Sequence, residues 1–285
     1  MTSDSPLTSG TPLTEEVQEA LFAEGAPTLS IDTKHLAGMV SEILRIDLQK
    51  AELIVDESER LYISRMRERF SDLKIAERLK RTNPFLLRIR GIETVREWAA
   101  LQVQTALYAS EEEAVGHLLE SIAKICFPGA RVPENPEDLD FEATGENGEI
   151  EGYQVKMSWD CMPMSSRKNL SNTIRRLKNE HESAGGEFVG YFAPCYGRAT
   201  TSKSKGQDYI SLASREFWMR VGGGDPDYDV RVGNVCALLC SEFRTEVLES
   251  LVPSLVAQLA VAAESQIGNG SGGIDNNRLF RRINK

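Results

Sequence analysis

Residues 138–158, with the sequence DLDFEATGENGEIEGYQVKMS, decide the fold of this chain. Every second residue between 138 and 143 is apolar, and this period of two is typical of a β-strand. Asn147-Gly148 follows, which is the strongest short signal for a β-hairpin turn. Residues 153–158 alternate apolar and polar side chains again. The stretch therefore predicts two antiparallel strands joined by a tight turn.

The sequence around the hairpin is helical before it and mixed after it. Apolar residues that recur every three or four positions predict amphipathic helices. The fourth of these starts at Ser110, a helix-capping residue followed by acids. The expected helices before the hairpin span residues 36–55, 62–79, 95–107 and 110–126. The expected elements after it are a helix over about 166–183 capped by Ser165 or Ser166, strands over 188–193 and 209–212, and helices over 213–221, 235–252 and 254–263.

This order of elements predicts the α/β class. We expect a small mixed β-sheet flanked by helices, with large helical additions at the N- and C-terminal ends. The chain has 285 residues, which is enough for a sizeable buried core. No apolar run approaches the roughly 20 residues that a membrane helix needs. The five cysteines form no Cys-x-x-Cys pair, so neither a disulfide framework nor a zinc site is indicated. We expect a reduced, cytoplasmic protein that does not bind membranes.

Charge is unevenly distributed along the chain. The net charge of −10 argues against an anionic partner on average, but the local distribution decides what binds where. Residues 59–90 hold ten basic and four acidic side chains, and residues 165–205 hold eight basic and three acidic ones. These segments either offer basic surfaces to an anionic polymer or are solvated helix faces.

The hairpin also gathers polar groups. If Leu139 and Phe141 face the core, Asp140 projects from the opposite face, where it lies near Gln154 and Lys156 of the return strand. A carboxylate, a further oxygen ligand and a lysine are what metal-assisted phosphodiester hydrolysis requires, because Mg²⁺ prefers oxygen ligands and lowers the pKa of bound water. The alternative is an ordinary cross-strand ion pair on a solvated face.

The segment from Asp140 to Lys156 resembles the PD-(D/E)xK nuclease signature. More specifically, the chain is similar to type II restriction endonucleases that cut interrupted GGNCC-type palindromes. The resemblance covers roughly residues 83–220 and rests on motifs in the same order. These motifs are Asn83-Pro84-Phe85, Gly116-His117-Leu118-Leu119-Glu120, Leu139-Asp140-Phe141, Gly148-Glu149-Ile150-Glu151, Val155-Lys156, Val189-Gly190-Tyr191-Phe192 and Glu216-Phe217-Trp218.

The resemblance implies a function and a site. Asp140 would be a metal ligand and Lys156 the catalytic lysine of a Mg²⁺-dependent homodimer. Each subunit would cut one strand of double-stranded DNA and leave a 5′-phosphate. Our interpretation is therefore a site-specific DNA endonuclease.

One position departs from the family pattern, because Gln154 stands where an acid is expected. Either Gln154 serves together with the Val155 carbonyl, or a carboxylate from elsewhere replaces the missing one. Glu142 and Glu120 are the candidates, whereas Glu151 has the wrong strand parity. The departure also leaves open a catalytically inactive DNA-binding protein with a nuclease-like fold.

The region after the lysine strand suits DNA contact. The start of the following helix offers hydroxyl, amide and backbone N–H groups to phosphates or base edges, and an arginine there or in the next loop could bond guanine. The candidate DNA-binding residues are Ser165, Ser166, Arg167, Lys168, Asn169, Arg198, Lys203 and Lys205. For Arg175, Arg176 and Lys178 we favour a solvated helix face.

We expect five regions along the chain. These are a flexible acidic arm (1–30, with a short helix near 15–23), an N-terminal helical region for dimerisation and DNA embrace (31–110), the catalytic nuclease core (111–225), C-terminal helices (226–265), and a flexible basic tail (266–285).

Overall fold

The computed structural model describes residues 33–71, 74–241 and 252–284. Within them the chain forms two compact units that interleave along the sequence. One unit contains residues 33–62 and 113–239, and the other contains residues 63–112 and 240–284. The expected acidic arm, and the end of the helix expected over 235–252, lie outside the described residues.

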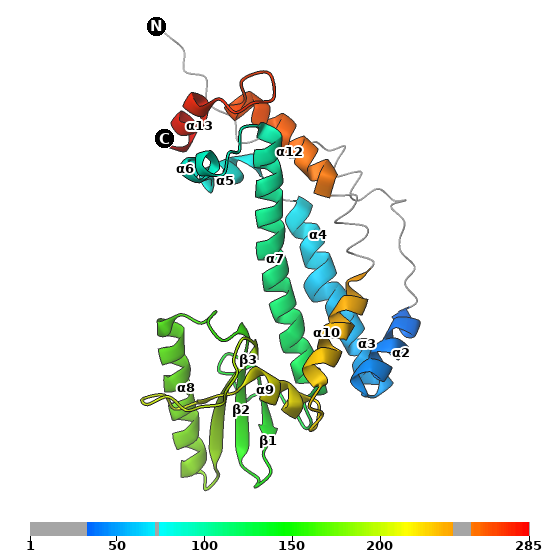
Figure 1. The fold of residues 1–285 in the computed structure, drawn as a ribbon. Helices are drawn as coiled ribbons and strands as arrows, with labels where there is room; N and C mark the ends of the chain where they lie inside the picture. Colours follow the sequence, from blue (N-terminus) through cyan, green and yellow to red (C-terminus); the bar gives the residue numbers. More distant parts are fainter. Residues whose placement is uncertain (1–32, 72–73, 242–251, 285) are drawn as a thin grey trace. The chain divides into compact units, whose positions relative to one another are not determined.

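A four-stranded mixed sheet is the centre of the first unit (Figure 1). Its strands lie in the order β1 (Phe141–Thr144), β2 (Ile150–Ser158), β3 (Phe188–Tyr196) and β4 (Ile210–Ser211). β1 and β2 are antiparallel, whereas β2–β3 and β3–β4 are parallel. The small mixed sheet and the hairpin that the sequence predicts are confirmed.

The hairpin turn spans residues 145–148. The Gly148 N–H donates to the Gly145 carbonyl at 3.1 Å. Gly148 has a φ of +88°, which glycine adopts without the steric cost of a side chain. Phe141 then pairs with Tyr153, and this register fixes every later position of the hairpin.

The two faces of the sheet carry different cores. On one face the Phe141 ring stacks on Tyr153 with centroids 4.8 Å apart, and Tyr153 stacks on Tyr191. On the other face Leu139 packs in a cluster with Phe192. Tyr191 and Phe192 are consecutive in β3 and point to opposite faces. The expectation that Leu139 and Phe141 face the same core is therefore wrong, because β1 begins at Phe141 and the alternation does not reach Leu139.

Helix α8 (Met164–Ser183) covers the face that carries Leu139, as Figure 1 shows. Two glycines, Gly152 and Gly190, are partners across β2 and β3 on this face. A Cβ on Gly190 would collide with the side chain of Ile174, and a Cβ on Gly152 would collide with Leu139. The absence of a side chain at Gly190 lets α8 approach the sheet closely, and its absence at Gly152 makes room for Leu139 and Phe188.

The other helices of this unit correct two sequence expectations. The helix expected over 36–55 is broken into α2 (Thr33–Leu44) and α3 (Leu48–Ser58). Arg45 has a φ of +56°, and Asp47 caps α3 by accepting from the Lys50 N–H at 2.8 Å. The expected helices 95–107 and 110–126 are one helix, α7 (Val95–Cys126), so Ser110 is not a cap. α9 (Ser214–Val221) and α10 (Tyr228–Leu239) complete the unit.

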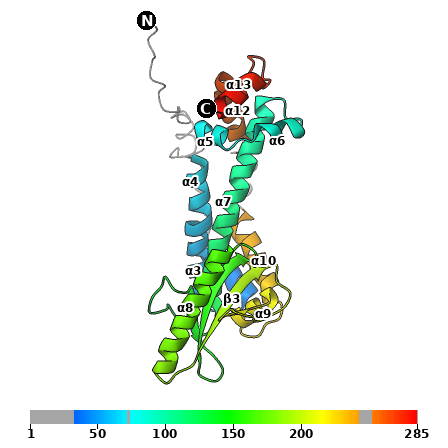
Figure 2. The same ribbon diagram turned by 90° about the vertical axis from the view of Figure 1, so that its left-hand side faces the viewer.

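The second unit is helical. Its elements are α4 (Ser64–Ser71), α5 (Ile75–Lys80), α6 (Pro84–Ile89), the first part of α7, α12 (Val252–Ile267) and α13 (Asn276–Ile283), and a π-helical turn, η1 (Glu59–Ile63), precedes α4. α12 and α13 lie beside α5, and α13 also lies beside α6 (Figure 2). The buried Trp98 indole donates to the Thr82 hydroxyl at 3.0 Å.

The C-terminal segment differs from the expected flexible tail. Residues 268–273 form a closed turn in which the Asn269 N–H donates to the Gly273 carbonyl at 2.9 Å. The basic residues that follow lie on α13, whose Leu279 is buried. None of the described helices has the length and apolarity that a membrane crossing needs.

We predict that Gly190→Ala destabilises the protein by about 1–3 kcal/mol, because the new methyl group overpacks the contact with Ile174. The urea unfolding midpoint is the measurement. Gly233→Ala is the control, since a methyl group on Gly233 in α10 would point into open space, and helix propensity favours alanine by about 0.5–1 kcal/mol. A Gly190→Ala protein as stable as the parent would contradict the close packing of α8.

Candidate active site

Asp140 lies immediately before β1, at the edge of the hairpin pairing. Its backbone N–H donates to the Tyr153 carbonyl at 3.0 Å. Its carboxylate Oδ2 accepts from the Val155 N–H at 2.6 Å and from the Gln154 Nε2 at 2.5 Å. A side-chain oxygen thus takes the place of a backbone carbonyl where the β1–β2 ladder ends. The Asp140 carboxylate is held firmly and is mostly buried.

Lys156 approaches the same carboxylate. Its Nζ lies 3.9 Å from the Asp140 Oδ2, and about a third of its side chain is exposed. Gln154 and Lys156 are two residues apart in β2 and so share a face. The structure therefore brings together Asp140, Gln154 and Lys156, as the sequence predicts.

Glu120 reaches this cluster from α7. Burial and the charge of Asp140 raise the pKa of the Glu120 carboxyl to about 7, while the Lys156 charge acts in the opposite direction. One turn earlier in α7, Gly116 faces β2, and a Cβ there would lie 3.6 Å from the Met157 Cβ. Residues four apart share a helix face, so this close approach of α7 to β2 also carries Glu120 to the site.

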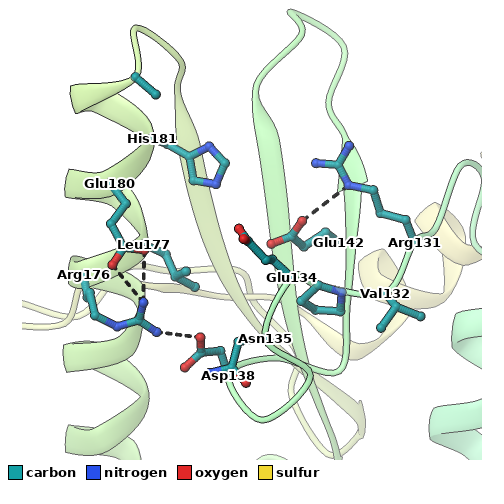
Figure 3. A pocket seen from close by; sticks show the side chains of 12 residues that line it. Arg131, Val132, Glu134, Asn135, Asp138, Glu142, Arg176, Leu177, Glu180 and His181 are labelled. Atoms are coloured by element: carbon teal, nitrogen blue, oxygen red, sulfur yellow. Dashed lines mark hydrogen bonds and ion pairs between the residues drawn. The ribbon is translucent and has the colours of Figure 1, made fainter.

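Glu142, the other candidate substitute, is engaged elsewhere. Its carboxylate Oε2 accepts from the Arg131 Nε at 3.4 Å. The pair lines a cavity of about 720 Å³ between the loop before β1 and α8, where Arg176 bonds Asp138 at 2.5 Å (Figure 3). Between the two candidates, the geometry favours Glu120 as the carboxylate that joins Asp140.

Glu151 points to the opposite face of β2, as its parity predicts. Its carboxylate accepts from the Tyr153 hydroxyl at 2.6 Å, from the Tyr191 hydroxyl at 3.2 Å and from Arg220 at 3.3 Å. Burial and the hydrogen bond to Glu151 raise the pKa of Tyr153. The Arg220 guanidinium also lies 4.8 Å from the Tyr191 ring centroid. These contacts make Glu151 part of a buried structural network.

The donors around Asp140 suit a hard cation. The carboxylates of Asp140 and Glu120, the Gln154 amide and the Val155 carbonyl all offer oxygen, the ligand atom that Mg²⁺ prefers. Burial of Glu120 and the charge of Asp140 raise the pKa of Glu120, and the charge of Lys156 offsets these effects only partly. Within residues 33–71, 74–241 and 252–284, no group of three or more His, Cys, Asp and Glu side chains is arranged for a metal ion.

The first turn of α8 differs from expectation at its cap. The helix begins at Met164 after Pro163, and no side chain caps it. Ser165 and Ser166 therefore lie inside the first turn, and the expectation that one of them is the cap is wrong. Ser165 is exposed there, as are its neighbours Lys168 and Asn169.

Arg167 faces the protein. Its Nε donates to the Met162 carbonyl at 2.9 Å, and its Nη2 donates to the Trp159 carbonyl at 2.5 Å. The guanidinium thus closes the loop between β2 and α8. The sequence did not predict this structural role, because no local pattern around Arg167 indicates that its side chain bonds backbone carbonyls rather than DNA.

The basic loop 197–209 is anchored at both ends. The Arg198 Nη2 donates to the Ser202 hydroxyl at 2.7 Å, and Ser202 forms an antiparallel bridge with Ser211. Near the other end, Asp208 accepts from Ser171 of α8 at 2.8 Å. The Lys203 and Lys205 side chains between these anchors are exposed.

The basic residues in the middle of α8 have acidic partners of their own. Arg175 bonds Asp208 at 2.7 Å, Arg176 bonds Asp138 and Glu180, and Lys178 lies 3.7 Å from Glu182. This arrangement agrees with the solvated helix face that we favour from the sequence.

A small mixed sheet whose hairpin joins an aspartate and a lysine, with helices on both sides, is the arrangement of a nuclease-like fold. The chain matches the family model of the type II restriction endonuclease EcoO109I over residues 48–232 and belongs to this family of site-specific DNA endonucleases. No curated protein matches it. Family membership makes the chain a site-specific deoxyribonuclease that acts on double-stranded DNA.

We predict that, without metal, the free energy of unfolding of the parent protein falls relative to that of the Glu120→Gln variant as pH rises from 5 to 8. The Glu120 carboxyl has its ordinary pKa of 4.5 when unfolded and about 7 when folded, so the folded chain binds this proton more tightly. The destabilisation caused by the ionised Glu120 carboxylate is absent below about pH 4.5. It grows between about pH 4.5 and pH 7 and is complete above about pH 7. Urea unfolding in EDTA at both pH values measures it. A difference between the two proteins that does not change with pH would contradict the burial of Glu120 beside Asp140.

Proposed function

We propose that this endonuclease is a Mg²⁺-dependent homodimer that recognises an interrupted GGNCC-type palindrome, cuts both strands and leaves 5′-phosphates. The observation that carries the proposal is the cluster at the end of the β1–β2 ladder. There, the Asp140 Oδ2 lies 3.9 Å from the Lys156 Nζ and accepts from the Val155 N–H. Membership in the restriction endonuclease family supports the same chemistry.

We assign the cation to Asp140, Glu120, Gln154 and the Val155 carbonyl. Mg²⁺ bound there would offset charge on the scissile phosphate and lower the pKa of an attacking water. Asp140 is kept in place by the Val155 N–H and the Gln154 amide, so its carboxylate does not have to reorganise. Glu120 supplies the second negative charge that Gln154 lacks.

Lys156 acts on the substrate and the water. Its ammonium group is partly exposed and lies beside the Asp140 carboxylate. From this position it can hold a nonbridging phosphate oxygen and orient the water for attack. In the in-line displacement the water oxygen forms the new bond to phosphorus and the bond to the 3′-oxygen breaks. The 3′-oxygen leaves as a hydroxyl after taking a proton from solvent, and the phosphate stays on the 5′-oxygen.

A palindromic site fits a symmetric enzyme. Two copies related by a two-fold axis place one active site on each strand of a symmetric duplex. We assign the dimer contacts and the embrace of the duplex to the helical region 31–110 and the C-terminal helices 226–265. We assign phosphate or base contacts to the exposed residues near the start of α8, Ser165, Lys168 and Asn169, and to Arg198, Lys203 and Lys205. The enzyme would act in the cytoplasm, on DNA that enters the cell.

We predict that Lys156→Ala and Asp140→Asn each lower the rate of plasmid cleavage by at least about 100-fold, because a positioned charge at the reacting phosphate contributes on this scale. Glu120→Gln should raise the Mg²⁺ concentration needed for half-maximal cleavage. The measurement is conversion of supercoiled to linear plasmid over a range of Mg²⁺ concentrations.

The controls are matched by residue type. Lys178→Ala removes an exposed lysine of α8 that pairs with Glu182, and Glu142→Gln removes the carboxylate that pairs with Arg131. Both should cleave like the parent at the parent's Mg²⁺ concentration. Full cleavage by a folded Lys156→Ala or Asp140→Asn protein would refute the site, and a Mg²⁺ dependence altered by Glu142→Gln but not by Glu120→Gln would move the second carboxylate to Glu142.

We further predict that the double variant Lys203→Ala/Lys205→Ala reduces the slope of log K against log[salt] for DNA binding by about 1–2, because each phosphate contact contributes about 0.9 to the slope. Both lysines are exposed on the anchored loop between β3 and β4. Filter binding over a series of salt concentrations measures the slope. Lys178→Ala should leave it unchanged, and an unchanged slope in the double variant would remove this loop from the DNA interface.

A further inference from the structure

Large apolar side chains are exposed where β2 and β3 end. Trp159 follows the last residue of β2 and is 42% exposed, and Tyr196, the last residue of β3, is 49% exposed. Ser158 and Tyr196 are partners in the parallel register, so the two strands end side by side. Met164, the first residue of α8, is 80% exposed. We name the exposed Trp159 ring the aromatic platform.

The Trp159 ring is braced from the protein side. The Arg167 guanidinium carbon lies 5.7 Å from its ring centroid, and the Arg167 Nη2 holds the Trp159 carbonyl. A Cβ at Gly197 would lie 2.9 Å from the Trp159 Cδ1, so the glycine backbone fits against the indole edge. Gly197 also has a φ of +88°, which disfavours any other residue. The Trp159 indole is therefore held in place by its neighbours while 42% of the residue stays exposed. A ring ordered in this way loses little conformational entropy when it binds a partner.

The platform lies close to the proposed catalytic lysine. Trp159 is three positions after Lys156, which corresponds to about 10 Å along an extended chain. This distance is about three base steps of a duplex, whose rise is about 3.4 Å per step along one strand. Arg198 directly follows Gly197, and α8 carries the exposed Lys168 and Asn169 near its start. A polyanion held at Lys156 therefore places its bases within reach of the Trp159 ring.

We propose that Trp159, held by Arg167 and Gly197, stacks on a base of the double-stranded DNA substrate at a partly opened step within about three base pairs of the scissile phosphate. Protein side chains inserted at a base step unstack it and bend the duplex, and aromatic rings stack on any exposed base face. This inference rests on the proposed function, because it takes Lys156 as the place of the scissile phosphate.

Tryptophan fluorescence offers a direct test. The chain has three tryptophans, and in the structure Trp98 is fully buried and Trp218 is 3% exposed, which leaves Trp159 to respond to a partner. The Lys156→Ala protein is titrated in Mg²⁺ with a fluorescein-labelled duplex that the wild-type enzyme cleaves. Anisotropy of the label reports binding, and intrinsic fluorescence of the protein reports stacking.

We expect the intrinsic fluorescence to fall along the same saturation curve as the anisotropy change. Adding Trp159→Phe should abolish the fluorescence change and keep the affinity within about threefold, because a ring remains. Trp159→Ala should weaken binding about tenfold, the scale of one base–aromatic stack. Val132→Ala, at an exposed apolar residue in the loop before β1, is the control and should bind like its parent.

The outcomes separate this inference from the proposed function. Saturable binding without a change in intrinsic fluorescence, or a folded Trp159→Ala variant that binds like its parent, overturns the platform and leaves the nuclease site intact. Absence of cleavage by the wild-type protein on every duplex and plasmid tried overturns the proposed function itself. Unfolding midpoints of all variants by circular dichroism identify any loss of binding that comes from loss of the fold.

Discussion

The hydrogen bond from the Val155 N–H to the Asp140 carboxylate is the contact on which the site depends. At the end of the β1–β2 ladder the Val155 N–H donates to this side chain instead of to a backbone carbonyl of β1. The Asp140 carboxylate is thereby held in a fixed position. Because Val155 and Lys156 are consecutive, the bond that holds the carboxylate also sets its distance from the lysine. The proposed catalytic geometry is built on rigid strand backbone, which would keep the charges in place before substrate arrives.

The two faces of β2 have separate tasks. One face carries the polar groups that gather around Asp140, together with Gly152, which makes room for Leu139 and Phe188. The opposite face buries Glu151 among two tyrosines and Arg220. A buried carboxylate with all of these donors is costly to disrupt, since removing one partner leaves an uncompensated charge. This network ties β2 and β3 to α9 independently of the polar cluster around Asp140.

The sequence predicts the hairpin and its polar cluster because both follow from local chemistry. An Asn-Gly turn sets the register, and strand parity then determines that Gln154 and Lys156 share a face while Glu151 does not. The alternation fails at Leu139, where the strand has not yet begun. The break expected at Ser110 is absent, because α7 is already helical there and a residue inside a helix has no free N–H groups to cap. The choice of Glu120 over Glu142 depends on how α7 lies against β2, a long-range contact that spacing alone does not encode.

The start of α8 has anchoring positions and exposed positions. Arg167 is an anchoring residue, because its guanidinium donates hydrogen bonds to the carbonyls of Trp159 and Met162 and so fixes the loop between β2 and α8. Ser165, Lys168 and Asn169 near it are exposed, so substitutions there leave the hydrogen bonds of Arg167 intact. A helix with separate anchoring and exposed positions tolerates substitutions at the exposed ones. If these residues contact DNA as proposed, preferences for new DNA sequences would arise by such substitutions without a change of the fold.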